Sequence, residues 1–141
     1  MKEVHILLVE DNEGDIVLTL EAFEESKIKS KISVVRNGKD ALNFLSKVGE
    51  FENVSKPDLI LLDLNIPIFN GMDVLCYIKE HSEFKKIPVI ILTTSSSQND
   101  INKAYEQHTN SYVIKPIDMD EFIKAILKIE QFWLQLTKLA E

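Results

Sequence analysis

Short, uninterrupted apolar runs recur along the chain, and longer segments between them have apolar residues spaced three or four apart. Runs of roughly four to eight apolar residues are typical of strands buried on both faces, and the wider spacing is typical of helices with one buried face. Strands are therefore predicted at residues 4–9, 31–35, 59–62, 89–92 and 112–114. Their regular alternation with helices predicts a parallel sheet covered on both faces.

Helices are predicted in the intervals between these strands and after the last one. They are expected at 15–26, from Asn37-Gly38 to Val48, after Gly71, at 99–107, and from an N-cap at Asp118 to the end of the chain. The segment 49–57 is expected to be a polar loop. Five such strand–helix units predict the α/β class, with a doubly wound five-stranded parallel sheet in the order 2-1-3-4-5.

The last helix has more apolar surface than one sheet is expected to cover. One stripe packs on the sheet in this interpretation, and it consists of Phe122, Ile126, Ile129, Trp133 and Leu136. Ile123, Leu127 and Leu134 lie about 120° from that stripe, at ~100° per residue. We expect these three residues to form a homodimer contact, through a face that the last helix shares with helix 99–107 and strand 112–114.

Composition narrows the classes of function. The chain has 141 residues, one cysteine and a net charge of −7, which indicates one domain in a reducing compartment and argues against a nucleic-acid surface. No apolar run approaches the ~18 to 20 residues that cross a bilayer, so a cytoplasmic protein is expected. The whole chain, 1–141, is expected to be one domain without an output module, so that any output comes from binding.

Polar residues that could bind one Mg²⁺ ion and a phosphoryl group follow four of the five predicted strands. They are Glu10-Asp11, Asp63, Thr93 and Lys115. Ligands of open parallel sheets bind outside the carboxyl ends of the strands, so these side chains are expected to meet in one site. Asp11 and Asp63 can each give Mg²⁺ one oxygen, Glu10 can hold a coordinating water, and the backbone carbonyl of Asn65 can be a third protein ligand.

The second oxygen of Asp63 would then be free to attack phosphorus and form an acyl phosphate. Lys115 and Thr93 could each contact one phosphoryl oxygen and stabilise its charge.

Other interpretations remain open from the residues alone. Each polar residue taken singly could be a turn or cap residue. A Mg²⁺-dependent phosphohydrolase would use the same aspartyl phosphate, but such enzymes place a general acid two residues after the nucleophile, where this chain has Asn65. A flavin-binding protein would need a phosphate loop after the first strand, where Glu10 and Asp11 would repel phosphate.

Four segments in order resemble the receiver domain of response regulators in two-component signalling: Val9–Asn12, 62–71, Leu92–Thr94 and 111–116. The resemblance implies a flavodoxin-like or chemotaxis-regulator-like fold. It also implies Mg²⁺ at Glu10 and Asp11, phosphorylation of Asp63, and contacts from Thr93 and Lys115 to the phosphoryl group. Tyr112 matches the aromatic residue that swings inward on activation.

The resemblance implies a histidine kinase as partner, and a protein that catalyses only its own aspartyl phosphorylation and dephosphorylation. Three further segments, 84–88, 105–108 and Phe132-Trp133, resemble those of the small stand-alone regulators that partner cyanobacterial phytochromes. One departure from the usual receiver pattern is His108-Thr109-Asn110, where many receivers have Gly-Ala before the fifth strand.

Overall fold

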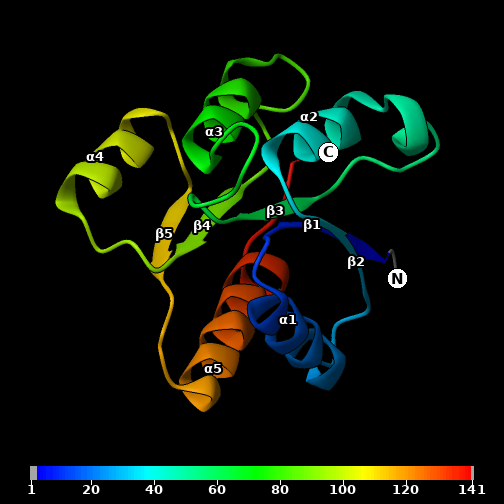
Figure 1. Cartoon of the computed structure of the whole chain (residues 1–141). Coiled ribbons are helices and arrows are strands. Elements are labelled where there is room, and N and C mark those ends of the chain that lie inside the picture. The colour runs from blue at the N-terminus through cyan, green and yellow to red at the C-terminus, as the bar shows by residue number, and fades with distance from the viewer. Residues whose placement is uncertain (1–2, 141) are drawn as a thin grey trace.

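A five-stranded sheet forms the centre of the protein (Figure 1). The structure is a computed structural model that describes residues 3–140. All strand pairs are parallel, and the order β2-β1-β3-β4-β5 is the predicted one. The strands are β1 Val4–Val9, β2 Ser30–Val35, β3 Leu59–Leu62, β4 Val89–Thr93 and β5 Ser111–Ile114. The doubly wound α/β fold is therefore confirmed.

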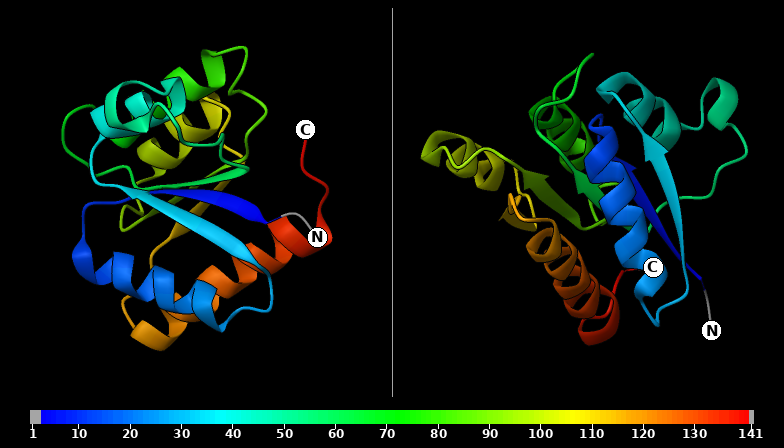
Figure 2. Two further views of the ribbon diagram at one scale, coloured as in Figure 1. Left: turned by 90° about the vertical axis from the view of Figure 1, so that its right-hand side faces the viewer. Right: turned by 60° about the horizontal axis from the view of Figure 1, so that its bottom comes forward.

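Within residues 3–140, five α-helices cover the two faces of the sheet. They are α1 Glu13–Glu25, α2 Gly38–Ser46, α3 Gly71–Glu80, α4 Gln98–Glu106 and α5 Met119–Glu130. Helices α1 and α5 lie together on one face, and α2, α3 and α4 lie on the other (Figures 1 and 2). Each helix begins with a polar side chain that accepts a hydrogen bond from an N–H three residues later; these caps are Asn12, Asn37, Asn70, Ser97 and Asp118.

Two hydrophobic clusters fill the space between the sheet and its helices. Alternate residues of β1 point to opposite faces, so that Leu7 and Val9 join one cluster and Ile6 and Leu8 join the other. All four residues of β3 are fully buried, as the unbroken apolar run predicts. The tightly packed core therefore fixes where each strand ends, and with it the position of the polar residues that follow.

The segment after α2 differs from the prediction. Helix α2 ends at Ser46 because Lys47 adopts the left-handed conformation with φ 56°, and Val48 is therefore exposed rather than on the buried face. The predicted polar loop contains a short 3-10 helix, η1 Gly49–Phe51. Its Phe51 packs against Phe44 with ring centroids 5.4 Å apart, an apolar contact that the surrounding polar residues concealed in the sequence.

The end of the chain also differs from the prediction of one helix from Asp118 onward. Helix α5 ends at Glu130 and continues as a π-helix, η2 Gln131–Leu136, which ends at Thr137. The N–H of Thr137 donates to the carbonyl of Phe132 at 3.0 Å, five residues earlier. This wider turn changes the direction of later side chains, and Leu136, which was expected to pack on the sheet, is 74% exposed.

The apolar flank of α5 is better covered than the sequence indicated. Ile123, Leu127 and Leu134 are half-buried and pack against the cluster that contains Ile16 and Phe23 of α1. Figure 2 shows α1 running beside α5, so a neighbouring helix covers surface that we had expected to stay open. The reason given for a dimer contact at these residues was therefore wrong in part, although the contact itself stays a prediction.

The loop before β5 is well anchored despite its departure from the usual receiver pattern. His108 adopts a left-handed conformation, and the buried Thr109 hydroxyl lies 3.0 Å from the carbonyl oxygens of Val89 and Ser111. The Asn110 side chain accepts the N–H of Val89 at 2.9 Å. Within residues 3–140, no helix has both the length and the apolar character needed to cross a membrane.

Candidate functional site

The register of the sheet brings the predicted site residues together at one edge. Val9 pairs with Leu62, so that Glu10 and Asp63 leave adjacent strands side by side. The N–H of Asp63 donates to the carbonyl of Val9 at 3.0 Å. On the other side of β4, the N–H of Lys115 donates to the carbonyl of Thr93 at 2.7 Å. The side chains of Glu10, Asp63 and Lys115 therefore converge as predicted. For Thr93 the structure shows the backbone contact with Lys115, and the role of its hydroxyl stays a prediction.

The ammonium of Lys115 is the centre of the site. Its Nζ lies 2.6 Å from Glu10 Oε1, 2.8 Å from Asp15 Oδ2 and 2.9 Å from Asp63 Oδ2. The lysine side chain is 5% exposed. Burial alone would lower the pKa of Lys115, but the hydrogen bonds to Asp15, Glu10 and Asp63 outweigh it and raise the pKa above its ordinary value. Lys115 is therefore a permanent positive charge here.

Asp15 is a member of the site that the sequence analysis missed. It was treated as the start of a helix, and its N–H is indeed capped by the Asn12 side chain at 2.9 Å. The first turn of α1 aims its carboxylate at Lys115, which is 100 residues away in sequence. The signal in the sequence was an acidic residue one helical turn after Asp11, but acidic residues are common in first helical turns for reasons of helix capping and dipole.

Glu10 and Asp63 are buried, at 2% and 6% exposure, and differ in charge state. Burial raises the pKa of Glu10 to about 7; the Lys115 hydrogen bond opposes this shift, and the charge of Asp63 adds to it. Burial would also raise the pKa of Asp63, but hydrogen bonds from Lys115, Glu10 and the N–H of Asn65 hold it below its ordinary value. Asp63 is therefore the carboxylate that stays ionised at neutral pH.

The carboxylates form a donor set that suits a divalent cation. Glu10, Asp11 and Asp63 each have an oxygen within 4.8 Å of the others, and Asp11 is exposed to solvent. Hard oxygen donors with an open side fit Mg²⁺, which keeps several of its waters. The N–H of Asn65 donates to Asp63 Oδ1 at 3.1 Å, which places this residue beside the cluster. The role of its backbone carbonyl as a ligand stays a prediction.

The connection after β3 is held close to the site by two glycines. A Cβ on Gly71 would lie 2.3 Å from the carbonyl oxygen of Asp63, and one on Gly38 would lie 1.9 Å from that of Phe69. The N–H of Gly38 also donates to the carbonyl of Pro67 at 3.0 Å. With α2 packed so closely, Ile68 and Phe69 adopt left-handed conformations that residues other than glycine rarely take.

Thr93 and Tyr112 lie on neighbouring strands near the phosphoacceptor candidate. Thr93 is fully buried, and its hydroxyl accepts the N–H of Ser95 at 3.4 Å. The Tyr112 hydroxyl donates to the Ser95 carbonyl at 2.9 Å, and the ring packs against the core. The Ser95 hydroxyl in turn donates to Asp100 of α4 at 2.6 Å. Both residues therefore contact the β4–α4 connection through Ser95.

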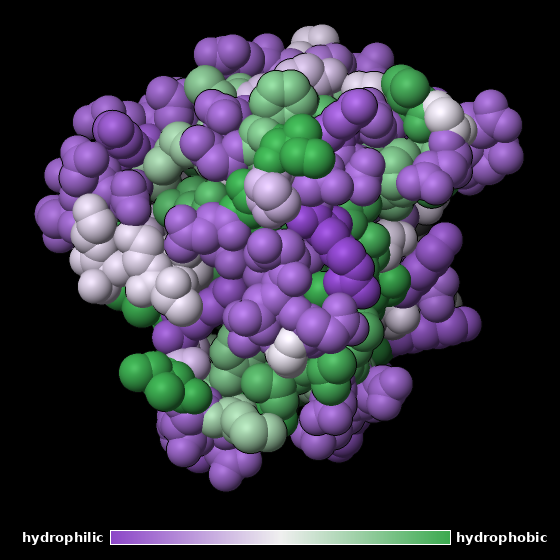
Figure 3. Space-filling model, in the orientation of Figure 1, coloured by the Kyte–Doolittle hydropathy of each residue, from purple (hydrophilic) through white to green (hydrophobic). Residues whose placement is uncertain are grey.

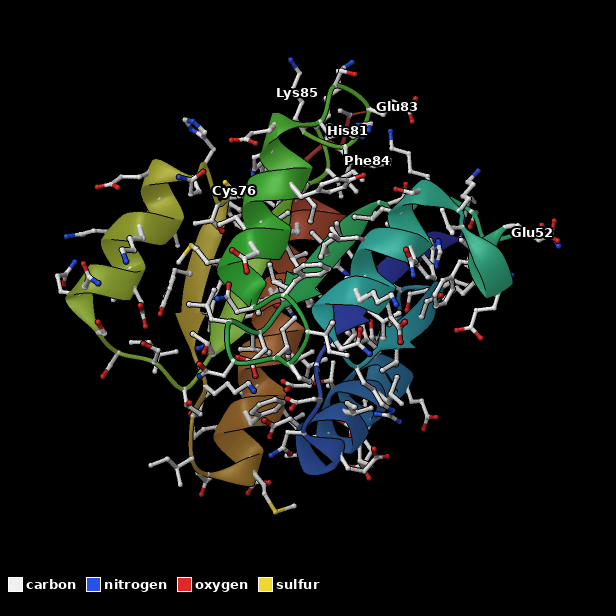
Figure 4. The ribbon with its side chains drawn as sticks, turned by 45° about the horizontal axis from the view of Figure 1, so that its top comes forward. Glu52, Cys76, His81, Glu83, Phe84 and Lys85 are labelled. Atoms are coloured by element: carbon white, nitrogen blue, oxygen red, sulfur yellow. The ribbon has the colours of Figure 1, made fainter. Side chains whose placement is uncertain are left out.

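The histidines and the cysteine lie away from these residues. The His5 ring lies between the hydroxyls of Ser33 and Ser55, at 2.8 and 3.0 Å, inside the core. His81 stacks on Phe84 at 4.1 Å near the end of α3, where both are labelled in Figure 4. Cys76 donates to the Gln107 side chain at 2.9 Å. These contacts indicate structural roles for all three residues.

Comparison with known proteins identifies the family of this chain. The model of the response regulator receiver domain matches residues 6–127. The chain belongs to the response regulator receiver domain family. Its receiver domain is 42% identical to the response regulator Rcp1 of Synechocystis sp., over 95% of this chain and 91% of Rcp1. It is 40% identical to the probable methanogenesis regulatory protein FilR2 of Methanothrix harundinacea, over 92% of this chain and 83% of FilR2.

Two solved structures are very similar to this receiver domain. The phosphorylated cyanobacterial phytochrome response regulator RcpA superposes with a TM-score of 0.97 at 40% identity, over 99% of this chain and 100% of RcpA. The Mn²⁺-bound form of Rcp1 superposes with a TM-score of 0.95 at 40% identity, over 98% of this chain and 99% of Rcp1. The resemblance to phytochrome-associated regulators that the sequence indicated is confirmed.

The raised pKa of Glu10 predicts a pH-dependent affinity for Mg²⁺. The cation favours ionised carboxylates, so the proton that Glu10 retains below about pH 7 must leave when Mg²⁺ binds. Affinity should therefore rise with pH, by up to about tenfold between pH 6 and pH 8 for one proton released. Isothermal titration at the two pH values measures it. Glu10→Gln, which has no proton to lose there, should flatten the dependence, and equal wild-type affinities at both pH values would contradict the assignment.

Proposed function

We propose that this receiver domain accepts a phosphoryl group from a histidine kinase on Asp63, with Mg²⁺ bound by Glu10, Asp11, Asp63 and the Asn65 carbonyl. One observation carries the proposal: Asp63 is a buried carboxylate that belongs to the candidate metal cluster and contacts the Lys115 ammonium, which helps to lower its pKa. A carboxylate in this setting can act as a nucleophile because its counter-charges are already in place. The chain would catalyse its own phosphorylation and dephosphorylation without turning over a small metabolite.

In the proposed reaction an Asp63 oxygen attacks the phosphorus of the donor. The new bond joins that oxygen to phosphorus, and the bond from phosphorus to the donor breaks, so the donor nitrogen leaves with the electron pair. Charge spreads over the three equatorial oxygens as this happens. Bound Mg²⁺ would neutralise part of that charge, and the Lys115 ammonium and Thr93 hydroxyl would donate hydrogen bonds to the remaining oxygens.

The kinase partner is supported by the rim of the site. Exposed apolar side chains lie in the connections that follow β3 and β5 and at the start of α5, and they are Ile68, Phe69, Ile117 and Met119. Figure 3 shows hydrophobic side chains on both sides of the hydrophilic middle of the face in view. Exposed apolar side chains gathered on one surface often mark a protein–protein contact. The relatives that are phytochrome response regulators make a phytochrome-like kinase in the cytoplasm the favoured partner.

Phosphorylation would change the position of Thr93 and Tyr112. A phosphoryl oxygen on Asp63 would attract the Thr93 hydroxyl, which now accepts only a long hydrogen bond from Ser95. The Tyr112 ring, already hydrogen-bonded to the Ser95 carbonyl, would be held inward more firmly as the β4–α4 connection closed over it. A shift of this kind can be no larger than the difference in contacts between the two arrangements.

The output would be binding through the face formed by α4, β5 and α5. We propose a homodimer in which Ile123, Leu127 and Leu134 pack at the edge of the contact. These residues are half-buried within one protomer, and the exposed Tyr105 and Ile114 on α4 and β5 extend the apolar surface. A symmetric contact would cover both at once.

Asp63→Asn should abolish phosphorylation by acetyl phosphate, because an amide is a poor nucleophile at phosphorus. Intact mass measured after incubation with Mg²⁺ should show one added phosphoryl group on the wild type and none on the variant. Asp58→Asn, a conservative change at the residue before β3, is the control and should be labelled like the wild type. Labelling of Asp63→Asn at the wild-type rate would rule out the proposed acceptor.

The switch and the dimer can be tested together by sedimentation with beryllofluoride, which mimics the phosphoryl group. The wild type should shift toward dimer, and Thr93→Ala should shift much less because the hydroxyl that reports the phosphoryl group is gone. Thr93→Ser, which keeps the hydroxyl, and Thr94→Ala, an exposed neighbour, should behave like the wild type. A wild type that stays monomeric at about 100 µM, well above the dissociation constants of most specific dimers, would contradict the dimer.

A further inference from the structure

Asp15 differs from the two other carboxylates that bind Lys115. Glu10 and Asp63 also belong to the candidate metal cluster, which consists of Glu10, Asp11 and Asp63. Asp15 lies in helix α1, whereas Glu10 and Asp63 follow strands, and its Oδ2 lies 2.8 Å from the Lys115 Nζ. Its backbone is fixed independently of its side chain, since its N–H is capped by Asn12 and its carbonyl accepts the Thr19 hydroxyl at 2.7 Å.

The ammonium has three N–H donors. In this structure it donates hydrogen bonds to Asp15 and Asp63, and it forms an ion pair with Glu10 at 2.6 Å. Phosphoryl transfer changes two of these contacts. Asp63 would give up its charge when one of its oxygens becomes part of the acyl phosphate, and Glu10 would share its oxygens with a bound cation. The N–H groups released can then serve a phosphoryl oxygen. Asp15 has no such change to undergo, so its hydrogen bond can persist through the whole reaction.

We propose that Asp15 is a positioning residue that holds the Lys115 ammonium beside Asp63 while the other two contacts of that ammonium change. The inference rests on the proposed function, because it concerns the same phosphoryl transfer. Lysine side chains are long and lose much rotational freedom when fixed. An anchor that is independent of both the metal and the phosphoryl group would keep Nζ aligned when the transition state forms.

The negative charge of Asp15 would have the opposite effect if it dominated. An additional carboxylate near Asp63 repels an anionic phosphodonor, so its removal would speed labelling. Positioning predicts that removal of Asp15 slows labelling. The two accounts are therefore distinguished by the sign of the change in rate, and Asp15→Asn separates them further because it removes the charge but keeps an acceptor oxygen.

The experiment measures the rate of labelling by acetyl phosphate at saturating Mg²⁺ and donor, together with the Mg²⁺ affinity by calorimetry. Asp15→Ala should be slower than the wild type by about tenfold, as expected for the loss of one charge-assisted hydrogen bond from a partly exposed carboxylate. Asp15→Asn and Asp15→Glu, which keep an acceptor, should stay within about threefold of the wild type. Mg²⁺ affinity should change little in all three variants.

Glu13→Gln is the matched control. Glu13 lies in the same helical turn and carries the same charge, but it pairs with Arg36 at 3.1 Å on the surface, so this variant should be labelled at the wild-type rate. Faster labelling of Asp15→Ala, or an unchanged rate, would overturn the inference while the wild type and Asp63→Asn still obey the proposed function. A fall in Mg²⁺ affinity that accounts for the slower rate would also overturn it. A wild type that takes no label would overturn both.

Discussion

Two carboxylates buried next to each other would repel strongly, and the site depends on the one buried ammonium that prevents this. Lys115 balances Glu10 and Asp63 inside the protein and Asp15 at its edge. Lys115 follows β5, Glu10 follows β1 and Asp63 follows β3, whereas Asp15 lies in the first turn of α1. The ion pairs therefore connect four elements at the carboxyl edge of the sheet. Charges with this little exposure are tolerated only when paired. The arrangement leaves an excess of negative charge beside solvent, which a divalent cation can neutralise.

The elements around this cluster divide into a rigid part and a part that can respond. Close packing fixes the connection after β3, because Gly38 and Gly71 leave no room between it and its neighbours. The β4–α4 connection is held instead by hydrogen bonds that converge on Ser95, from Tyr112 and to Asp100. Hydrogen bonds of this kind can exchange partners at low cost, whereas the glycine contacts cannot. A signal at Asp63 is therefore expected to leave through β4, β5 and α4.

The sequence was sufficient for features that depend on local pattern. Apolar residues marked all five strands, although β1 contains His5 and β2 contains Lys31 and Ser33. The common direction of the strands predicted that Glu10, Asp63 and Lys115 would meet in one site. Features that depend on tertiary contacts could not be predicted from the sequence. Asp15 was taken for an ordinary first-turn acid, since nothing local indicates a lysine 100 residues away. The π-turn after Glu130 and the cover that α1 gives to Leu127 likewise depend on how α5 meets the rest of the protein.

The stability of Lys115→Met, measured by urea unfolding with EDTA and with Mg²⁺, tests the central claim most directly. Lys124→Met is the control, because Lys124 is 64% exposed and pairs with Glu121 at the surface. Without Mg²⁺, the free energy of unfolding of Lys115→Met should be about 3 kcal/mol lower than that of the wild type, as when one partner of a buried ion pair is removed. That of the control should fall by less than about 1 kcal/mol. Mg²⁺ should stabilise Lys115→Met more than it stabilises the wild type, since the cation then supplies the missing charge. A loss no larger than that of Lys124→Met would show that Lys115 does not hold the carboxylates together.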